Sequence, residues 1–232
     1  PNYIKYLTYI LIFTFCFVLI DGYIQFFSGK NLLGYEYNGI RMSGVFGKEY
    51  ILGSFLSRLL PIVFALTLLT FQNNNKIVYP LSVLLIATDV LIYISGERLA
   101  FFYVTLITLL FICLISRWKK IRISTFIISL GIIMLISFTS KDLKQRMIDD
   151  TIEQTNILGE DKVAFTSEHE ALYSSALSIY KDNYFFGIGP KMFRLFCDYP
   201  QYKTKFGCST HPHNTYIQLL VETGILGFAF FL

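Results

Sequence analysis

The chain has 232 residues, of which 54% are hydrophobic and only 16% charged, and its mean hydropathy is +0.53. This composition excludes an ordinary soluble domain and indicates a protein of the lipid bilayer. We therefore expect membrane lipids among its partners, and no nucleic acid.

Apolar residues gather in six blocks, each close to the roughly 20 residues with which a helix crosses the ~30 Å hydrocarbon core. The blocks are residues 3–20, 51–71, 78–95, 99–116, 122–139 and 213–232. They lack the alternation of polar and apolar residues that is typical of a membrane β-barrel. The sequence therefore predicts an all-α fold, a polytopic bundle of transmembrane helices.

The chain begins at Pro1 rather than Met and stops within an apolar block, so we interpret it as a fragment of a longer membrane domain. We divide it into transmembrane spans over residues 1–139, a long loop at 140–211 and a final span at 212–232. The first part contains a further loop at 21–50.

Basic residues in alternate loops predict the orientation, because Lys and Arg are retained on the cytoplasmic side. One side holds six basic residues and no acidic one: Lys5, Lys76, Arg117, Lys119, Lys120 and Arg122. Residues 21–50, 95–98 and 140–211 then lie outside, in the periplasm of a multi-pass bacterial inner-membrane protein. The last of these segments is too long for a mere connection and is the natural place for function.

The long outer loop contains one predicted helix and one predicted bend. Residues 166–182 have capping residues in Thr166 and Ser167, acids in the first turn and apolar residues at helical spacing. We expect this amphipathic helix to lie along the membrane surface. The sequence GIGP at 187–190 predicts a sharp bend.

No metal or other cofactor is implied by the acidic and histidine residues. The acidic pairs at 149–150 and 160–161 lie in polar surroundings, so we interpret them as surface charge. A zinc site would need more ligands than His211, His213 and the distant His169 provide.

The four cysteines divide into two kinds. Cys16 and Cys113 lie in apolar blocks and are interpreted as packing residues. Cys197 and Cys208 both lie in the outer loop, where a disulfide would stabilise the loop by roughly 2–4 kcal/mol in an oxidising compartment. Two free thiols are the alternative.

The segment before the last apolar block has the features of a helix start. Pro212 suits the first helical position, which places His213 in the first turn, where the helix dipole favours anions and a neutral imidazole that can accept a proton. Asn214, Gln218 and Glu222 recur every four residues. This polar stripe predicts contact with a hydrated cavity or, alternatively, hydrogen bonds to a neighbouring helix.

Three other charged residues lie in or near apolar blocks. Arg58 falls inside the second block, where it must reach the interface, pair with an acid or line a substrate cavity. Asp89 is a candidate partner for Arg58 or Arg98, and Glu97 is a candidate for orienting Arg98.

Several motifs resemble those of the O-antigen ligase and O-antigen polymerase superfamily. The main one is the His-Asn pair at 213–214, followed after nine residues by GILG at 224–227. The segments RMSGVFG at 41–47, SGER at 95–98 and DNYFFGIG at 182–189 look like the same family.

This resemblance implies about a dozen spans and a donor glycan linked to undecaprenyl diphosphate. It also implies no metal, with two periplasmic arginines and one histidine as essential residues. Matched by position, these are Arg41 and Arg98, which would bind the diphosphate, and His213, which would act as general base. Further candidates for substrate binding are Arg58, Glu97, Asn214 and Gln218.

The acceptor hydroxyl implied by the resemblance belongs either to lipid A-core, in ligation, or to a growing glycan, in polymerisation. The sequence does not separate these two reactions. A non-catalytic transporter is a different alternative, in which Arg58, Asp89 and Glu222 would line a pathway.

Overall fold

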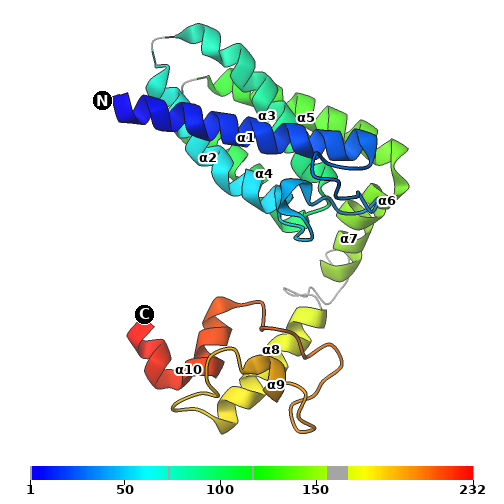
Figure 1. Ribbon diagram of the computed structural model, residues 1–232, viewed down its shortest axis with the longest axis vertical. Helices are drawn as coiled ribbons and strands as arrows, with labels where there is room; N and C mark the ends of the chain where they lie inside the picture. The colour runs from blue at the N-terminus through cyan, green and yellow to red at the C-terminus, as the bar shows by residue number, and fades with distance from the viewer. Residues whose placement is uncertain (1, 73, 117, 156–166, 232) are drawn as a thin grey trace. The chain divides into compact units, whose positions relative to one another are not determined.

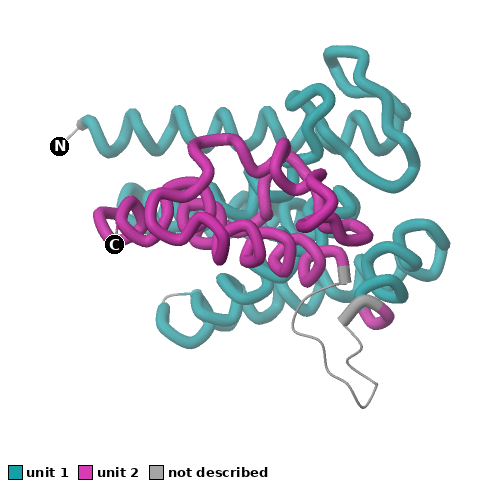
Figure 2. Tube along the Cα trace, turned by 90° about the horizontal axis from the view of Figure 1, so that it is seen from below, with its two compact units in different colours: residues 1–151 teal, residues 152–232 magenta. Residues whose placement is uncertain are grey.

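The computed structural model describes residues 2–72, 74–116, 118–155 and 167–231, and its regular elements are all helical. Figure 1 shows their order along the chain. The chain divides into two compact units, Pro1–Thr151 and Ile152–Leu232, which Figure 2 colours separately. The predicted all-α fold is confirmed.

Unit 1 is a helical bundle. Its long helices are α1 (Asn2–Ser28), α2 (Leu52–Thr70), α3 (Val78–Ile94), α4 (Arg98–Leu114) and α5 (Lys119–Thr139). Its short elements are η1 (Gly44–Phe46), η2 (Asn75–Ile77), α6 (Lys141–Lys144) and the π-helical turn η3 (Gln145–Asp149), while α7 (Asp150–Thr155) begins in unit 1 and ends in unit 2. Helix α3 packs against α5, and α2 packs against both α1 and α4.

Four helical segments among the described residues are long and apolar enough to cross a membrane. They are Tyr3–Ser28, Leu52–Thr70, Asn75–Ile94 and Lys119–Thr139. The other two predicted spans form shorter apolar helices, α4 and α10 (Thr215–Phe231), of 17 residues each. At 1.5 Å per residue each of these helices is only about 26 Å long, which is shorter than the ~30 Å thickness of the hydrocarbon core.

The first helix is longer than predicted, because polar residues in its last turns are buried rather than exposed in a loop. Asp21 and Gln25 are both fully buried. Asp21 accepts a hydrogen bond from the backbone N–H of Leu32 (3.0 Å), and Gln25 accepts one from the N–H of Gly44 (2.7 Å). These bonds attach the following loop to the end of α1.

Asp89 forms a buried ion pair with Arg122, so the predicted pairing with Arg58 or Arg98 is wrong. Its Oδ2 lies 3.3 Å from Arg122 Nη1, and both side chains are 4% exposed. Arg122 also donates to Thr108 Oγ1, so the pair connects α3, α4 and α5. Arg122 is therefore a core residue rather than part of a solvated basic cluster, while Arg117 lies outside the described residues.

Unit 2 contains α8 (Ser167–Asp182), α9 (Phe193–Phe196) and α10 around a core of its own. The fully buried side chains are Ala176, Ile179, Phe193, Cys197 and Val221. Helix α8 is the helix predicted over residues 166–182. Thr166 and the acidic pair at 160–161 lie outside the described residues.

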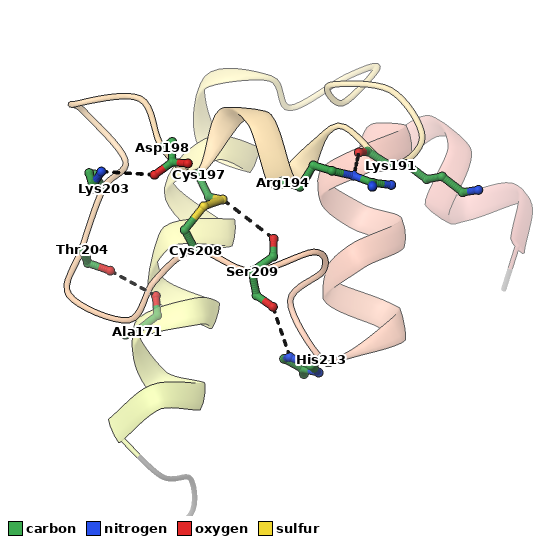
Figure 3. The surroundings of a disulfide bond; sticks show 10 residues. All are labelled: Ala171, Lys191, Arg194, Cys197, Asp198, Lys203, Thr204, Cys208, Ser209 and His213. Atoms are coloured by element: carbon green, nitrogen blue, oxygen red, sulfur yellow. Dashed lines mark hydrogen bonds and ion pairs between the residues drawn. A yellow bond between two sulfur atoms is a disulfide. The ribbon is translucent and has the colours of Figure 1, made fainter. Parts of the chain in front are cut away.

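A disulfide joins Cys197, directly after α9, to Cys208. Their Cα atoms are 5.1 Å apart and 11 positions separate them in the sequence. For a loop of this length, chain-entropy considerations give about 3 kcal/mol of stabilisation. Figure 3 shows that the bridge brings Ser209 beside α9.

Helix α10 is kinked at Gly224, where the segment after α8 packs against its backbone. Gly224 has φ 65° and ψ −175°, and a Cβ there would overlap the backbone of Phe185. Gly187 has φ 67°, and a Cβ there would overlap the carbonyl of Glu222. The 182–189 and 224–227 motifs are therefore two sides of one backbone contact, which explains why Gly187 and Gly224 are glycines.

Candidate active site

The predicted site residues fall into two groups, one in each unit. Arg41 and Arg98 lie in unit 1 near a third arginine, Arg146. His213 lies in unit 2 with His169 and His211. Each group is described by itself.

Arg41 is held by the loop between α1 and α2. The side-chain oxygen of Asn38 accepts the backbone N–H of Arg41 (2.7 Å), which fixes the chain at this point. The Arg41 guanidinium lies 4.7 Å from the centre of the Tyr50 ring and donates from Nη2 to the Tyr50 carbonyl (2.9 Å). Its Nε is buried and has no hydrogen-bond partner among the described residues.

Arg98 is the first residue of α4 and follows a tight turn. Gly96 has φ 73° in this turn, and the carbonyl of Ile40 lies so close that a Cβ would overlap it. The N–H of Met42 donates to the Ser95 carbonyl (3.2 Å). The loop that contains Arg41 is therefore packed directly against the turn that begins with Ser95 and ends at Arg98.

Glu97 binds the start of α2. Its carboxylate accepts hydrogen bonds from the backbone N–H of Gly53 (2.6 Å), the N–H of Ser54 (3.1 Å) and the Ser54 hydroxyl (2.6 Å). The N-terminal N–H groups of a helix need such an acceptor. Glu97 thus fixes the turn before Arg98 through α2, with its oxygens already occupied.

Arg146 is a further candidate residue, which the sequence motifs did not indicate. Its Nε donates to the Gly96 carbonyl (2.8 Å) from the π-helical turn η3, 50 residues along the chain. No hydrogen bond joins its terminal nitrogens to another described residue. Partial burial lowers the pKa of Arg146, and the charges of Arg41 and Arg98 lower it further, while Asp150 and Glu97 act in the opposite direction.

The three guanidinium groups therefore share one region at the turn between α3 and α4. Proteins seldom gather like charges unless an anion offsets their repulsion. Guanidinium groups bind phosphate oxygens through paired N–H donors. This region has the chemistry of a binding site for a phosphate or diphosphate.

His213 precedes α10 instead of lying in its first turn. Its φ is 58°, a left-handed conformation that interrupts the helix. The Asn214 side chain accepts the backbone N–H groups of Tyr216 (3.0 Å) and Ile217 (3.2 Å). Asn214 is therefore the N-cap, so the predicted helical position of Pro212 is wrong by three residues.

All three histidines of the chain lie close together around His213. Ring centres are 4.3 Å apart for His211 and His213, and 6.1 Å apart for His169 and His213. The expectation that His169 is distant is therefore wrong. Desolvation is the main cause that lowers the pKa of His213, and the other two histidines add to it. His213 Nε2 lies 3.4 Å from the Ser209 hydroxyl (Figure 3).

The remaining polar stripe of α10 is partly satisfied within the helix. Gln218 Nε2 donates to Glu222 Oε2 (3.3 Å). The other carboxylate oxygen, Glu222 Oε1, is buried and has no partner among the described residues. Their neighbour Asn214 is occupied in capping, so Gln218 and Glu222 are the members of this stripe that lie inside the helix.

Residues 80–232 match a family described as O-antigen ligase. The chain belongs to the O-antigen ligase family. Neither the curated proteins nor the solved structures yield a match. The matched region includes Arg98, Arg146 and His213, whereas Arg41 precedes it.

Membership of the O-antigen ligase family agrees with the apolar helices and indicates a membrane glycosyltransferase of the ligase or polymerase type. Within the described residues, no three His, Cys, Asp or Glu side chains are arranged to hold a metal ion.

Arg58 lies in the second turn of α2. It lines an open cavity of about 390 Å³ whose other walls are Ile51, Ser54, Phe55, Leu59 and Ile62. The side chain is exposed on the surface of the bundle. Its surroundings are thus mainly apolar, as expected for a residue that faces lipid or an apolar substrate chain.

Proposed function

We propose that this O-antigen ligase family member transfers a glycan from undecaprenyl diphosphate to an acceptor hydroxyl at the periplasmic face of the inner membrane. Arg41, Arg98 and Arg146 bind the diphosphate, and His213 accepts the proton of the attacking hydroxyl. The reaction needs no metal, because the arginines supply the positive charge. The gathering of three guanidinium groups at one turn is the observation on which the proposal chiefly depends.

The leaving group explains why several arginines are needed. When the bond to the sugar breaks, the diphosphate gains negative charge that is spread over several oxygens. Fixed cationic donors stabilise such charge as it develops. Arg41 is fixed by Tyr50 and Arg146 by Gly96, so neither has to be reoriented during the reaction.

An apolar groove beside this turn supports a lipid-linked donor. Helices α1, α3 and α5 enclose a cavity of about 440 Å³ with an almost wholly apolar lining, which includes Tyr23, Phe26, Ile94 and Ile136. Ile94 is only two residues before Gly96, which binds Arg146. An isoprenoid chain in this groove would have its diphosphate beside the arginines.

The imidazole of His213 supplies the proton acceptor. The acceptor O–H bond breaks and its proton moves to His213 Nε2, while the acceptor oxygen bonds to the anomeric carbon. The bond from that carbon to the diphosphate oxygen breaks, and the lipid diphosphate leaves with the electron pair. A lowered pKa keeps His213 neutral, which this step requires.

The test is the surface glycan of cells that carry His213→Ala, Arg41→Ala or Arg98→Ala, with each variant checked for its abundance in membranes. We expect each to abolish or strongly reduce the glycan. Arg194→Ala is the matched control, because Arg194 is exposed and its Nε also donates to a carbonyl, that of Lys191 (3.1 Å). Normal glycan from an abundant His213→Ala protein would disprove the general-base role.

The acceptor decides between ligation and polymerisation. In a deletion strain, loss of every ladder band with accumulation of the donor lipid indicates ligation to lipid A-core. Core that carries a single repeat indicates polymerisation on a growing glycan. Movement of the intact donor across a proteoliposome membrane, with no glycosidic bond formed, would indicate a transporter instead.

A further inference from the structure

Unit 2 contains a cavity of about 420 Å³ beside His213. One wall is the first turns of α8, with Glu168 and Leu172. The other is the segment around Cys208, with Phe206 inside the disulfide loop and Ser209 and His213 after it. The cavity is within the range of roughly 300–1,000 Å³ that is typical of small-molecule sites, and it lies wholly within one unit.

The walls combine an apolar surface with hydrogen-bonding groups. Leu172 is buried at 5% exposure, and Phe206 presents its ring to solvent at 57%. The carboxylate of Glu168 offers acceptors, and the Ser209 hydroxyl can donate or accept. A pyranose has the matching chemistry, since its C–H face packs on an aromatic ring and its hydroxyls both donate and accept.

The backbone of this cavity is strained at two positions. Phe206 has φ 67° and His213 has φ 58°, and only Trp118 and Lys191 share this property among the other described non-glycine residues. Left-handed backbone is costly for bulky side chains, and such strain is concentrated at ligand-binding and catalytic sites. Both strained residues face the same cavity, one on each side of Ser209.

The disulfide keeps these two residues in place. Cys208 lies between Phe206 and Ser209, and the bridge to Cys197 anchors it to the buried end of α9. On the other side, the Thr204 hydroxyl contacts the carbonyl of Ala171 in α8 (3.5 Å), as Figure 3 shows. The loop that presents Phe206 is thus tied to the rest of unit 2 at both ends.

We propose that this cavity binds the terminal sugar of the acceptor saccharide, with Phe206 and Glu168 as the residues that select it. This proposal rests on the proposed transferase function, because it places the acceptor sugar in the cavity that is lined by the general base His213. One hydroxyl of the sugar replaces Ser209 as the partner of His213 Nε2. The cavity holds a terminal sugar rather than a whole glycan, which suits acceptors that differ beyond their last unit.

The experiment measures sugar binding apart from transfer. The whole protein in nanodiscs is mixed with methyl glycosides of hexoses and of N-acetylhexosamines, and saturation-transfer NMR detects those that bind. Phe206→Ala and Glu168→Gln should reduce the signal of the bound glycoside at least about fivefold. Tyr199→Ala and Glu170→Gln are matched controls, an exposed aromatic of the same unit and an acid of the same helical turn, and should leave it unchanged.

Transfer kinetics with a lipid-linked donor give a second readout. Phe206→Ala should raise the KM for the acceptor about fivefold and leave the KM for the donor unchanged. A bound glycoside that responds to Phe206→Ala supports the cavity even if no transfer is found, which would refute only the transferase. The proposed sugar site is overturned if no probe gives a signal, or if Phe206→Ala and the unaltered protein give equal signals. Normal transfer in that case would still support the transferase function.

Discussion

Replacement of Arg146 by Met tests whether the third guanidinium binds the donor. The Nε of Arg146 is occupied by Gly96, so the terminal nitrogens are the groups available to an anion. A hydrogen bond to a charged group contributes about 1.5–3 kcal/mol. Loss of this contact should therefore lower kcat/KM for the lipid-linked donor by about 10- to 150-fold, with the acceptor KM unchanged.

The same substitution should have little effect on stability, because it removes repulsion from Arg41 and Arg98 as well as the bond to Gly96. The assay is initial-rate transfer by purified protein at donor concentrations below KM, together with the melting temperature. Arg146→Lys should be intermediate, since it keeps the charge and loses the paired donors. Arg194→Met is the control. A stable Arg146→Met protein with full kcat/KM would refute the role of Arg146.

Three further predictions concern the fold and the base. Gly224→Ala should cost about 1–3 kcal/mol in backbone strain and lower the melting temperature, whereas Gly131→Ala, with open space around it, should not. Asp89→Asn should cost about 3–5 kcal/mol by leaving Arg122 buried without its counter-charge, measured by unfolding in detergent, with recovery in a double variant that also carries Arg122→Gln. Because the pKa of His213 is below the ordinary 6.5, kcat/KM should fall only as pH drops below that value; an acid midpoint above it contradicts the lowered pKa.

The helices could be predicted because apolar blocks of bilayer length have few other uses. The ends of the helices could not be predicted where polar residues are buried and bind the backbone of the neighbouring loop. Asp21 and Gln25 read as the beginning of a loop, yet they are buried and bind the backbone that follows α1. His213 reads as helical after Pro212, yet its left-handed backbone leaves Asn214 to cap the helix.

The family motifs indicated Arg98 and His213 as candidates, but the residues gathered around them come from distant parts of the chain. Arg146 reaches the turn at Gly96 over 50 residues, and His169 meets His213 from the first turn of α8. Neither is part of a motif with a recognisable spacing. The one signal that could have indicated Arg146 is that it is an arginine in the loop at 140–211, which the basic residues had assigned to the outer side.

The position of Glu97 explains how an acid next to Arg98 is compatible with an anion site. Glu97 accepts two backbone N–H groups at the start of α2, where the helix dipole already favours negative charge. Its carboxylate oxygens are thus occupied by the start of α2. The same bonds fix the turn that leads into α4, so Glu97 holds the backbone before Arg98 in the place that the proposed diphosphate site requires.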